Sequence, residues 1–145
     1  MDSENFAAGN AAGKIIYDFT WIPKYRYKML TQAKYYNACE ASIRDAAKRH
    51  DMNVVELSVM PDHVHCIVQC PQRLSASDAA KILKGCSARE MFKIQPKFRL
   101  RYPRGHFWSE RYHVNTVGEA NLKEAIDYVR APHNDPRQTN LTQYN

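Results

Sequence analysis

The stretch Met60-Pro61-Asp62-His63-Val64-His65-Cys66-Ile67-Val68 is the most informative part of the chain. It is mostly apolar after Asp62, apart from its two histidines, and this pattern predicts a β-strand near the centre of a sheet. Side chains at positions i and i+2 of a strand leave the same face, with backbones about 6.5–7 Å apart. His63 and His65 can therefore converge on one metal ion while Val64 and Cys66 pack on the opposite face.

Asp62 precedes the histidine pair and adds a carboxylate to it. A carboxylate at this position is either a further metal ligand or a hydrogen-bond partner that orients a ligand. The alternative is a pair of histidines that face solvent, or that form hydrogen bonds within the protein, and bind no ion. The spacing by itself leaves both interpretations open.

Outward from this strand, the chain alternates predicted strands and helices. Apolar periodicity and capping patterns predict strands at 14–21, 53–59, 63–69 and 107–115, and helices at 31–48, from 79 to about 94, and from about 117 to 131. The second and third helices follow the capping-box patterns Ser75-Ala-Ser-Asp78 and Thr116-Val-Gly-Glu119. Gly85 is expected to interrupt the second helix or to pack closely within it.

The order β-α-β-β-α-β-α predicts an α+β fold, a ferredoxin-like or RRM-like sandwich. We expect an antiparallel sheet of four to five strands with helices on one face and a C-terminal helix lying across the sheet. The expected organisation is a flexible tail at 1–13, a single domain at 14–133 and a polar tail at 134–145. In the last helix, Tyr128 lies beside the apolar stripe of Leu122, Ala125, Ile126 and Val129, so it can reach beside the sheet.

The composition favours a soluble protein with a polyanionic partner. The 145 residues carry a formal net charge of +6, which suits nucleic acid or a membrane surface. We expect no membrane span and no signal peptide. None of the four cysteines forms a Cys-x-x-Cys pair, which favours reduced thiols and a cytoplasmic location. A zinc site of His65, Cys66 and Cys70 is disfavoured because adjacent strand residues point to opposite faces.

Basic residues gather in three segments that suit single-stranded nucleic acid, because cations bind phosphates and aromatic rings stack on bases. The first interleaves cations with tyrosines at 24–28, the second is the helix after Ser75, and the third is the loop at 97–106. The candidate nucleic-acid contacts are Lys24, Arg26, Lys28, Lys81, Lys84, Arg89, Arg99, Arg101 and Arg104. The alternative for each segment is an ordinary solvated surface.

Five blocks of sequence, in this order, carry a family resemblance. They are Trp21-Ile-Pro-Lys-Tyr-Arg26, Val59-Met-Pro-Asp-His-Val-His-Cys-Ile-Val68, Leu83-Lys-Gly-Cys-Ser-Ala-Arg89, Phe107-Trp-Ser-Glu-Arg-Tyr-His-Val-Asn-Thr-Val-Gly118 and Ala125-Ile-Asp-Tyr-Val-Arg130. Through them the chain resembles the single-tyrosine HUH (His-hydrophobe-His) transposases, of the transposase-A type, of insertion sequences that move as single-stranded DNA.

The resemblance implies a DNA transposase that binds hairpins at element ends. It implies that His63 and His65 bind Mg²⁺ or Mn²⁺ and that Tyr128 is the nucleophile, which cleaves and rejoins single-stranded DNA through a 5′-phosphotyrosine. It also implies a homodimer with shared active sites. The family usually places a glutamine, the third metal ligand, four residues after the tyrosine, where this chain has Pro132. His133 or Asp62 is a possible substitute, water is another, and weakened catalysis is a further possibility.

Two other functions compete with the transposase. One is a non-catalytic single-stranded nucleic-acid-binding module of RRM-like fold, in which the histidines have no catalytic part. The other is a small metal-dependent hydrolase, which the basic charge and the tyrosine helix disfavour.

Overall fold

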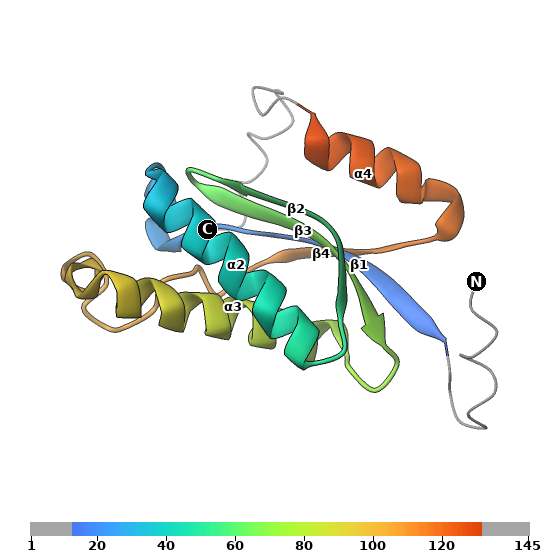
Figure 1. The fold of residues 1–145 in the computed structure, drawn as a ribbon, viewed down its shortest axis with the longest axis horizontal. Helices are drawn as coiled ribbons and strands as arrows, with labels where there is room; N and C mark the ends of the chain where they lie inside the picture. Colours follow the sequence, from blue (N-terminus) through green and yellow to red (C-terminus); the bar gives the residue numbers. More distant parts are fainter. Residues whose placement is uncertain (1–12, 132–145) are drawn as a thin grey trace.

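The computed structural model describes residues 13–131, which form one four-stranded antiparallel sheet in the order β2-β3-β1-β4 (Figure 1). The strands are β1 (Lys14–Trp21), β2 (Asn53–Met60), β3 (His63–Pro71) and β4 (His113–Val117). The long pairings of β3 with β1 and with β2 put the histidine strand inside the sheet. The α+β sandwich and the central place of this strand are thus confirmed.

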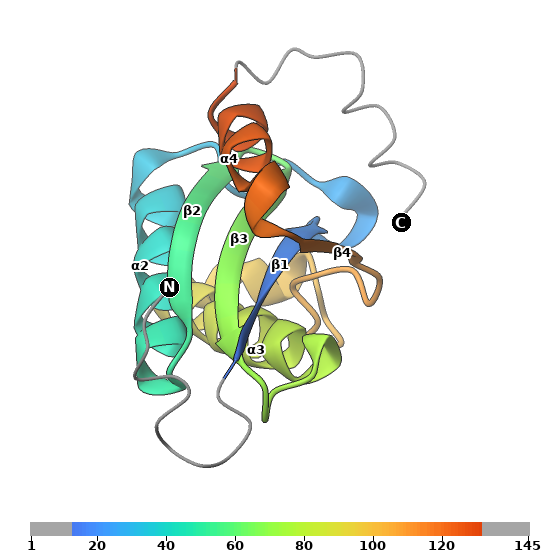
Figure 2. The same ribbon diagram turned by 90° about the vertical axis from the view of Figure 1, so that its right-hand side faces the viewer.

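Helices cover both faces of the sheet. The helices α2 (Ala33–Arg49) and α3 (Ala76–Ile94) lie side by side on one face, and α4 (Leu122–Arg130) crosses the other (Figures 1 and 2). Short 3-10 turns at Lys24–Arg26, Pro96–Leu100 and Glu119–Asn121 connect these elements. No helix within residues 13–131 is long and apolar enough to cross a membrane.

The hydrophobic core lies between the sheet and the pair α2 and α3. Val64, Cys66 and Val68 of β3 point into it and are fully buried, as are Ile43 of α2 and Leu83 of α3. Strand periodicity then places His63 and His65 on the opposite face, under α4. The fold therefore separates an apolar layer from a polar sheet face.

The capping box predicted for the second helix is present, and the one predicted for the third helix is not. At Ser75 the hydroxyl accepts from the Asp78 amide, the Asp78 carboxylate accepts from the Ser75 amide, and α3 begins at once, at Ala76. At Thr116 the chain is still extended, because Thr116 and Val117 pair with Tyr17 and Ile16 of β1. As a result α4 begins only at Leu122, without a side-chain cap.

The fourth strand was predicted too early in the chain. Only an isolated bridge between Trp108 and Pro23 forms near the predicted start, and the ladder with β1 begins at His113. Trp108 is instead buried in the core. There its indole N–H donates to the Ser87 hydroxyl at 2.9 Å. Gly85 neither interrupts α3 nor packs closely, since an added Cβ would meet nothing within 4 Å. The predicted tails lie almost entirely outside the described residues.

Candidate functional site

The histidine pair lies on β3 and is withdrawn from solvent. His63 is 4% exposed and His65 is 7% exposed. A buried imidazole needs hydrogen-bond partners, and each of these rings has a carboxylate. The two carboxylates come from different parts of the chain.

Asp62 orients His63 and is itself held by Arg26. The Nδ1 of His63 donates to Asp62 Oδ1 at 3.0 Å, and Arg26 Nε donates to Asp62 Oδ2 at 3.0 Å. Hydrogen bonding from His63, together with the charge of Arg26, lowers the pKa of Asp62 to about 2. Asp62 is thus ionised at neutral pH, and the proton that it fixes on Nδ1 leaves the lone pair of His63 on Nε2.

Asp18 is a site residue that the sequence analysis missed. It lies on β1, and its Oδ1 accepts from His65 Nε2 at 2.6 Å. The register of the β1–β3 ladder pairs Thr20 with His65 and Asp18 with Ile67, so Asp18 is one side-chain step from His65 on the same face. A single carboxylate inside an otherwise apolar and aromatic strand was the available signal.

Tyr128 lies beside the histidine pair of its own chain. Its ring contacts the ring of His65 edge to face, with centroids 5.7 Å apart. Two anchors dock α4 here: Val129 is 1% exposed, and Arg130 Nε donates to Glu56 Oε2 of β2 at 2.7 Å. The predicted position of Tyr128, beside the apolar stripe and against the sheet, is confirmed.

The described residues supply part of a metal site. Two imidazoles share one face, and the Asp18 carboxylate reaches His65, a donor set that suits a divalent cation. Within residues 13–131, however, no group of three or more His, Cys, Asp or Glu residues has metal-binding geometry. Asp62 is occupied with His63 and Arg26. Pro132 and His133 lie outside the described residues.

The cysteines do not contribute to this site. Cys66 and Cys70 are buried on the core side of β3, and burial raises the pKa of Cys66 to about 12 and that of Cys70 to about 11. All four cysteines are free thiols. The zinc site of His65 with Cys66 is therefore absent, as the alternation of strand side chains predicted.

The nine predicted nucleic-acid contacts fall into two regions of the surface. One surrounds the turn at Lys24–Arg26 and the loop beside it; the other is α3. In the first, Arg26 is bound to Asp62, Lys24 lies over the Tyr25 ring and Arg101 over the Tyr27 ring. Lys28, Arg99, Arg101 and Arg104 are exposed, and Arg99 also lines a groove beside α3.

The second region borders an open groove of about 1370 Å³ between α2, α3 and residues 105–112. Lys81 and Arg89 line it and are exposed. Lys84 is half-buried, and its ammonium donates to the carbonyl oxygens of Ser109 at 2.8 Å and Glu110 at 3.2 Å. Lys84 thus holds the loop, whereas its two neighbours on α3 are available to a ligand.

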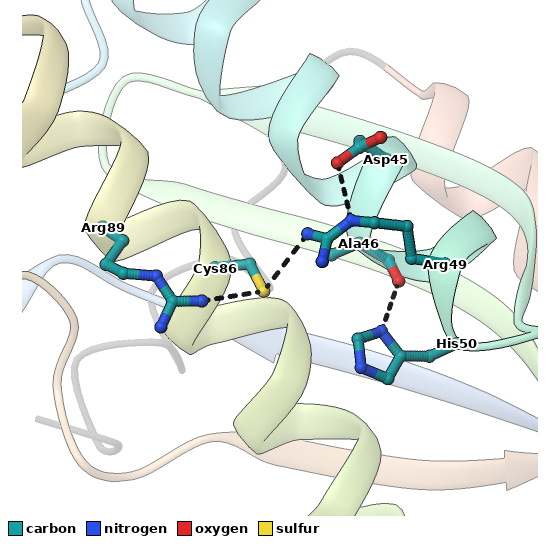
Figure 3. Close-up of polar contacts among 6 residues, drawn as sticks. All are labelled: Asp45, Ala46, Arg49, His50, Cys86 and Arg89. Atoms are coloured by element: carbon teal, nitrogen blue, oxygen red, sulfur yellow. Dashed lines mark hydrogen bonds and ion pairs between the residues drawn. The ribbon is translucent and has the colours of Figure 1, made fainter.

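Two guanidinium groups that line this groove contact the same thiol. Figure 3 shows the Cys86 thiol between Arg49 and Arg89, with N···S distances of 3.7 and 3.4 Å. Asp45 accepts from Arg49 at 2.9 Å and offsets one of the charges. The groove therefore joins arginines of α2 and α3, and Arg49 is a basic groove residue that the sequence analysis did not select.

Comparison with known proteins identifies the family. The family model described as "Transposase IS200 like" matches residues 11–132. The chain is 31% identical to the ISDra2 transposase TnpA of Deinococcus radiodurans over 81% of this chain and 83% of that protein. It is 26% identical to the transposase for insertion sequence element IS200 of Salmonella typhimurium, over 79% of this chain and 74% of that protein.

Solved structures agree. A crystal structure of a putative transposase from Deinococcus radiodurans has a TM-score of 0.67 and 31% identity, covering 81% of this chain and 90% of that one. A REP-associated tyrosine transposase bound to a REP hairpin has a TM-score of 0.56 and 17% identity, covering 79% of this chain and 64% of that one, and shows the shared fold. The chain belongs to the IS200-like transposase family, whose members cleave and transfer DNA.

Proposed function

We propose that this transposase cleaves and rejoins single-stranded DNA with Tyr128 as the nucleophile beside a divalent metal ion on His63 and His65. The observation that supports the proposal most is the contact of Tyr128 with His65, at a ring separation of 5.7 Å, within one chain. A phenol and a histidine pair at this distance can act on the same phosphodiester.

In the proposed reaction, the phenolic oxygen of Tyr128 forms a bond to phosphorus and the bond from phosphorus to the 3′ oxygen breaks. The phenol loses its proton, and the leaving oxygen gains one and becomes a 3′ hydroxyl. The 5′-phosphotyrosine keeps the phosphoester, so a second 3′ hydroxyl can attack it and release the tyrosine. Covalent capture thus allows rejoining without a separate energy source.

His63 and His65 would hold Mg²⁺ or Mn²⁺, which when bound supplies Lewis-acid polarisation of the scissile phosphate. Asp62 and Asp18 fix the orientation and protonation of these rings. His133 remains our candidate for the third ligand, and unchanged metal affinity of His133→Ala would exclude it.

We further propose that the substrate is a DNA hairpin at a transposon end. Support comes from the basic groove on the helical side, with Arg49, Lys81 and Arg89, and from the solved relative that is bound to a REP hairpin. The groove is lined by α2 and α3, whereas the histidine pair lies under α4, and these helices cover opposite faces of the sheet (Figure 1). A hairpin stem on the groove would therefore have to send its single-stranded flank around to the histidine face. A homodimer is also part of this proposal.

The decisive experiment uses a single-stranded oligonucleotide that carries a hairpin from the DNA flanking this gene and a fluorophore at its 3′ end. A 5′-phosphotyrosine leaves the labelled fragment on the protein, so a fluorescent protein band on a denaturing gel reports cleavage. We expect the band with Mg²⁺ or Mn²⁺ and its loss with EDTA. Tyr128→Phe should reduce it by on the order of a thousandfold or more.

Tyr36→Phe on α2 is the matched control and should leave the band unchanged. If the wild-type protein binds the oligonucleotide but forms no covalent band, and neither Tyr128→Phe nor EDTA changes that binding, the non-catalytic binding module is the better description. Turnover without a covalent band would instead favour the metal-dependent hydrolase.

A further inference from the structure

Tyr25 is an exposed aromatic residue on a strained turn. Its side chain is 62% exposed, and within residues 13–131 only Leu100 is a comparably exposed large hydrophobic. Its backbone has φ 63° and ψ 9°, and the next residue, Arg26, has φ 55°. Left-handed conformations cost free energy in residues other than glycine, and such strain tends to occur at functional sites.

A cluster of three tyrosines, Tyr25, Tyr27 and Tyr102, supports the Tyr25 ring, and all three rings contact one another. Tyr25 stacks on Tyr102, with centroids 6.4 Å apart and planes 29° apart, and Tyr27 stacks on Tyr102 at 5.7 Å and 24°. Tyr102 is 2% exposed, and its hydroxyl donates to the Lys24 carbonyl oxygen at 2.9 Å. The exposed Tyr25 ring therefore rests on a buried, fixed ring. This reduces the side-chain conformational entropy that would be lost when a ligand binds.

The tyrosine cluster lies beside the histidine site. Arg26, the residue after Tyr25, binds the carboxylate of Asp62 that orients His63. The amide of Leu30 donates to the Pro61 carbonyl oxygen at 3.1 Å, which ties the same connection to the end of the β2–β3 hairpin. Figure 2 shows this connection, in blue, passing that end of the sheet.

Two cations flank the tyrosine cluster and indicate the chemistry of its ligand. The Lys24 ammonium lies 5.5 Å from the centroid of Tyr25, and the Arg101 guanidinium lies 5.1 Å from that of Tyr27. A flat apolar ring flanked by cations matches a nucleobase on its phosphate backbone. An apolar protein partner would match the ring but not the charges.

We propose that Tyr25 is a stacking platform for one unpaired base of single-stranded DNA next to the scissile phosphate. Lys24 and Arg101 bind the flanking phosphates. The proposal rests on the proposed function, because it takes the strand at the histidine site as its ligand. It adds a contact that selects unpaired over paired bases, since a base must leave its own stack to lie on the ring.

The test measures binding and not cleavage. Two single-stranded oligonucleotides carry the same sequence and differ at the position next to the cleavage point, which bears 2-aminopurine in one and an abasic residue in the other. Affinity is measured by anisotropy of a distant dye, and 2-aminopurine fluorescence reports stacking. Scanning the modified position along the strand identifies the base that lies on the ring.

Tyr25→Ala should weaken binding of the base-bearing strand by roughly tenfold, within the range known for base–aromatic stacking, and should restore 2-aminopurine fluorescence. Tyr25→Asn should weaken binding to the same extent. Because asparagine tolerates the left-handed backbone, this loss of affinity could not be attributed to a loss of fold. Tyr25→Phe should keep wild-type affinity. Binding of the abasic strand should be the same in all of these proteins, and Leu100→Ala is the control for an exposed apolar side chain.

Equal losses on the base-bearing and abasic strands, or no loss at any scanned position, would overturn the platform. These results do not depend on cleavage. Failure of the proposed function is a missing covalent band with the wild-type protein, whereas failure of the platform is a normal band with no effect of Tyr25.

Discussion

The ring of Tyr128 packs edge to face against the imidazole of His65 in the same chain, with centroids 5.7 Å apart. This relationship brings α4 to the central strand of the sheet. It also means that the tyrosine and the histidines of one site come together within a single chain, without a second subunit. A dimer can form around two such pairings, or it can exchange α4 between chains.

Mixed dimers distinguish these two arrangements. Chains with Tyr128→Phe are mixed with chains with His63→Ala and His65→Ala, and covalent-adduct formation is measured. If the pairing within one chain is the active one, the mixture stays inactive, because every site lacks a component. Recovery of about a quarter of the wild-type band from an equal mixture would show that the tyrosine acts in the partner's site, because random exchange makes half of the dimers mixed and each mixed dimer has one complete site of two.

Asp18 should control metal affinity through His65. In Asp18→Asn the side chain keeps its size, but an amide can donate to His65 Nε2 and so alter which nitrogen carries the proton. We expect Mn²⁺ affinity to fall by roughly 10- to 100-fold, as for other partners of metal-bound histidines. Titration calorimetry measures the effect. Asp51→Asn is the control, and equal affinities for both variants would show that Asp18 has no such part.

Glu56 should position α4 more than it stabilises the protein. Its ion pair with Arg130 joins a side chain that is 18% exposed to one that is 66% exposed, so its contribution to the free energy of unfolding should be at most about 1 kcal/mol. Adduct formation in Glu56→Gln should slow several-fold, because this pair is one of the two anchors of α4. Arg130→Gln should match it, and the double variant should add nothing. Additive losses would contradict a shared anchor, and Arg73→Gln is the control.

Lys84 should make the free energy of unfolding increase with pH in the alkaline range. Burial lowers the pKa of its ammonium from 10.5 to about 8. Between these values the unfolded chain holds a proton that the folded chain has released, so raising the pH favours folding. The free energy of unfolding of the wild type, relative to Lys84→Met, should therefore be level below pH 8 and rise towards pH 10.5. Urea unfolding at several pH values measures it. Lys81→Met, on the exposed side of α3, should show no such trend.

Arg89 and Lys81 should contribute to the salt dependence of hairpin binding. Each phosphate contact that is lost reduces the slope of log affinity against log salt concentration by about 1. We expect this change for Arg89→Gln and for Lys81→Gln, measured by anisotropy on a labelled hairpin between low and moderate salt. Lys123→Gln on α4 is the control. Unaltered slopes in both groove variants would place the hairpin elsewhere.

The sequence by itself determined the parts of the site that lie close together along the chain. The alternation of His63, Val64 and His65 was enough to predict a central strand with both imidazoles on one face, because side-chain direction in a strand is a local property. The spacing of Ser75 and Asp78 likewise predicted the capping box, since it is formed within one turn, although α3 begins at Ala76, directly after the cap, and not at residue 79 as expected. Position along α4 predicted that Tyr128 would lie against the sheet.

The tertiary structure decided what depends on register between distant segments. Asp18 reaches His65 because β1 pairs with β3 in one register, and a shift of one residue would turn Asp18 to the other face. The pairing of β1 with β4 extends β4 through Thr116 and overrides a local capping signal, because ladder hydrogen bonds with β1 satisfy the backbone that the cap would have served. Likewise, the stack of Tyr25 on Tyr102 joins residues far apart in sequence, and only their packing could bring them together.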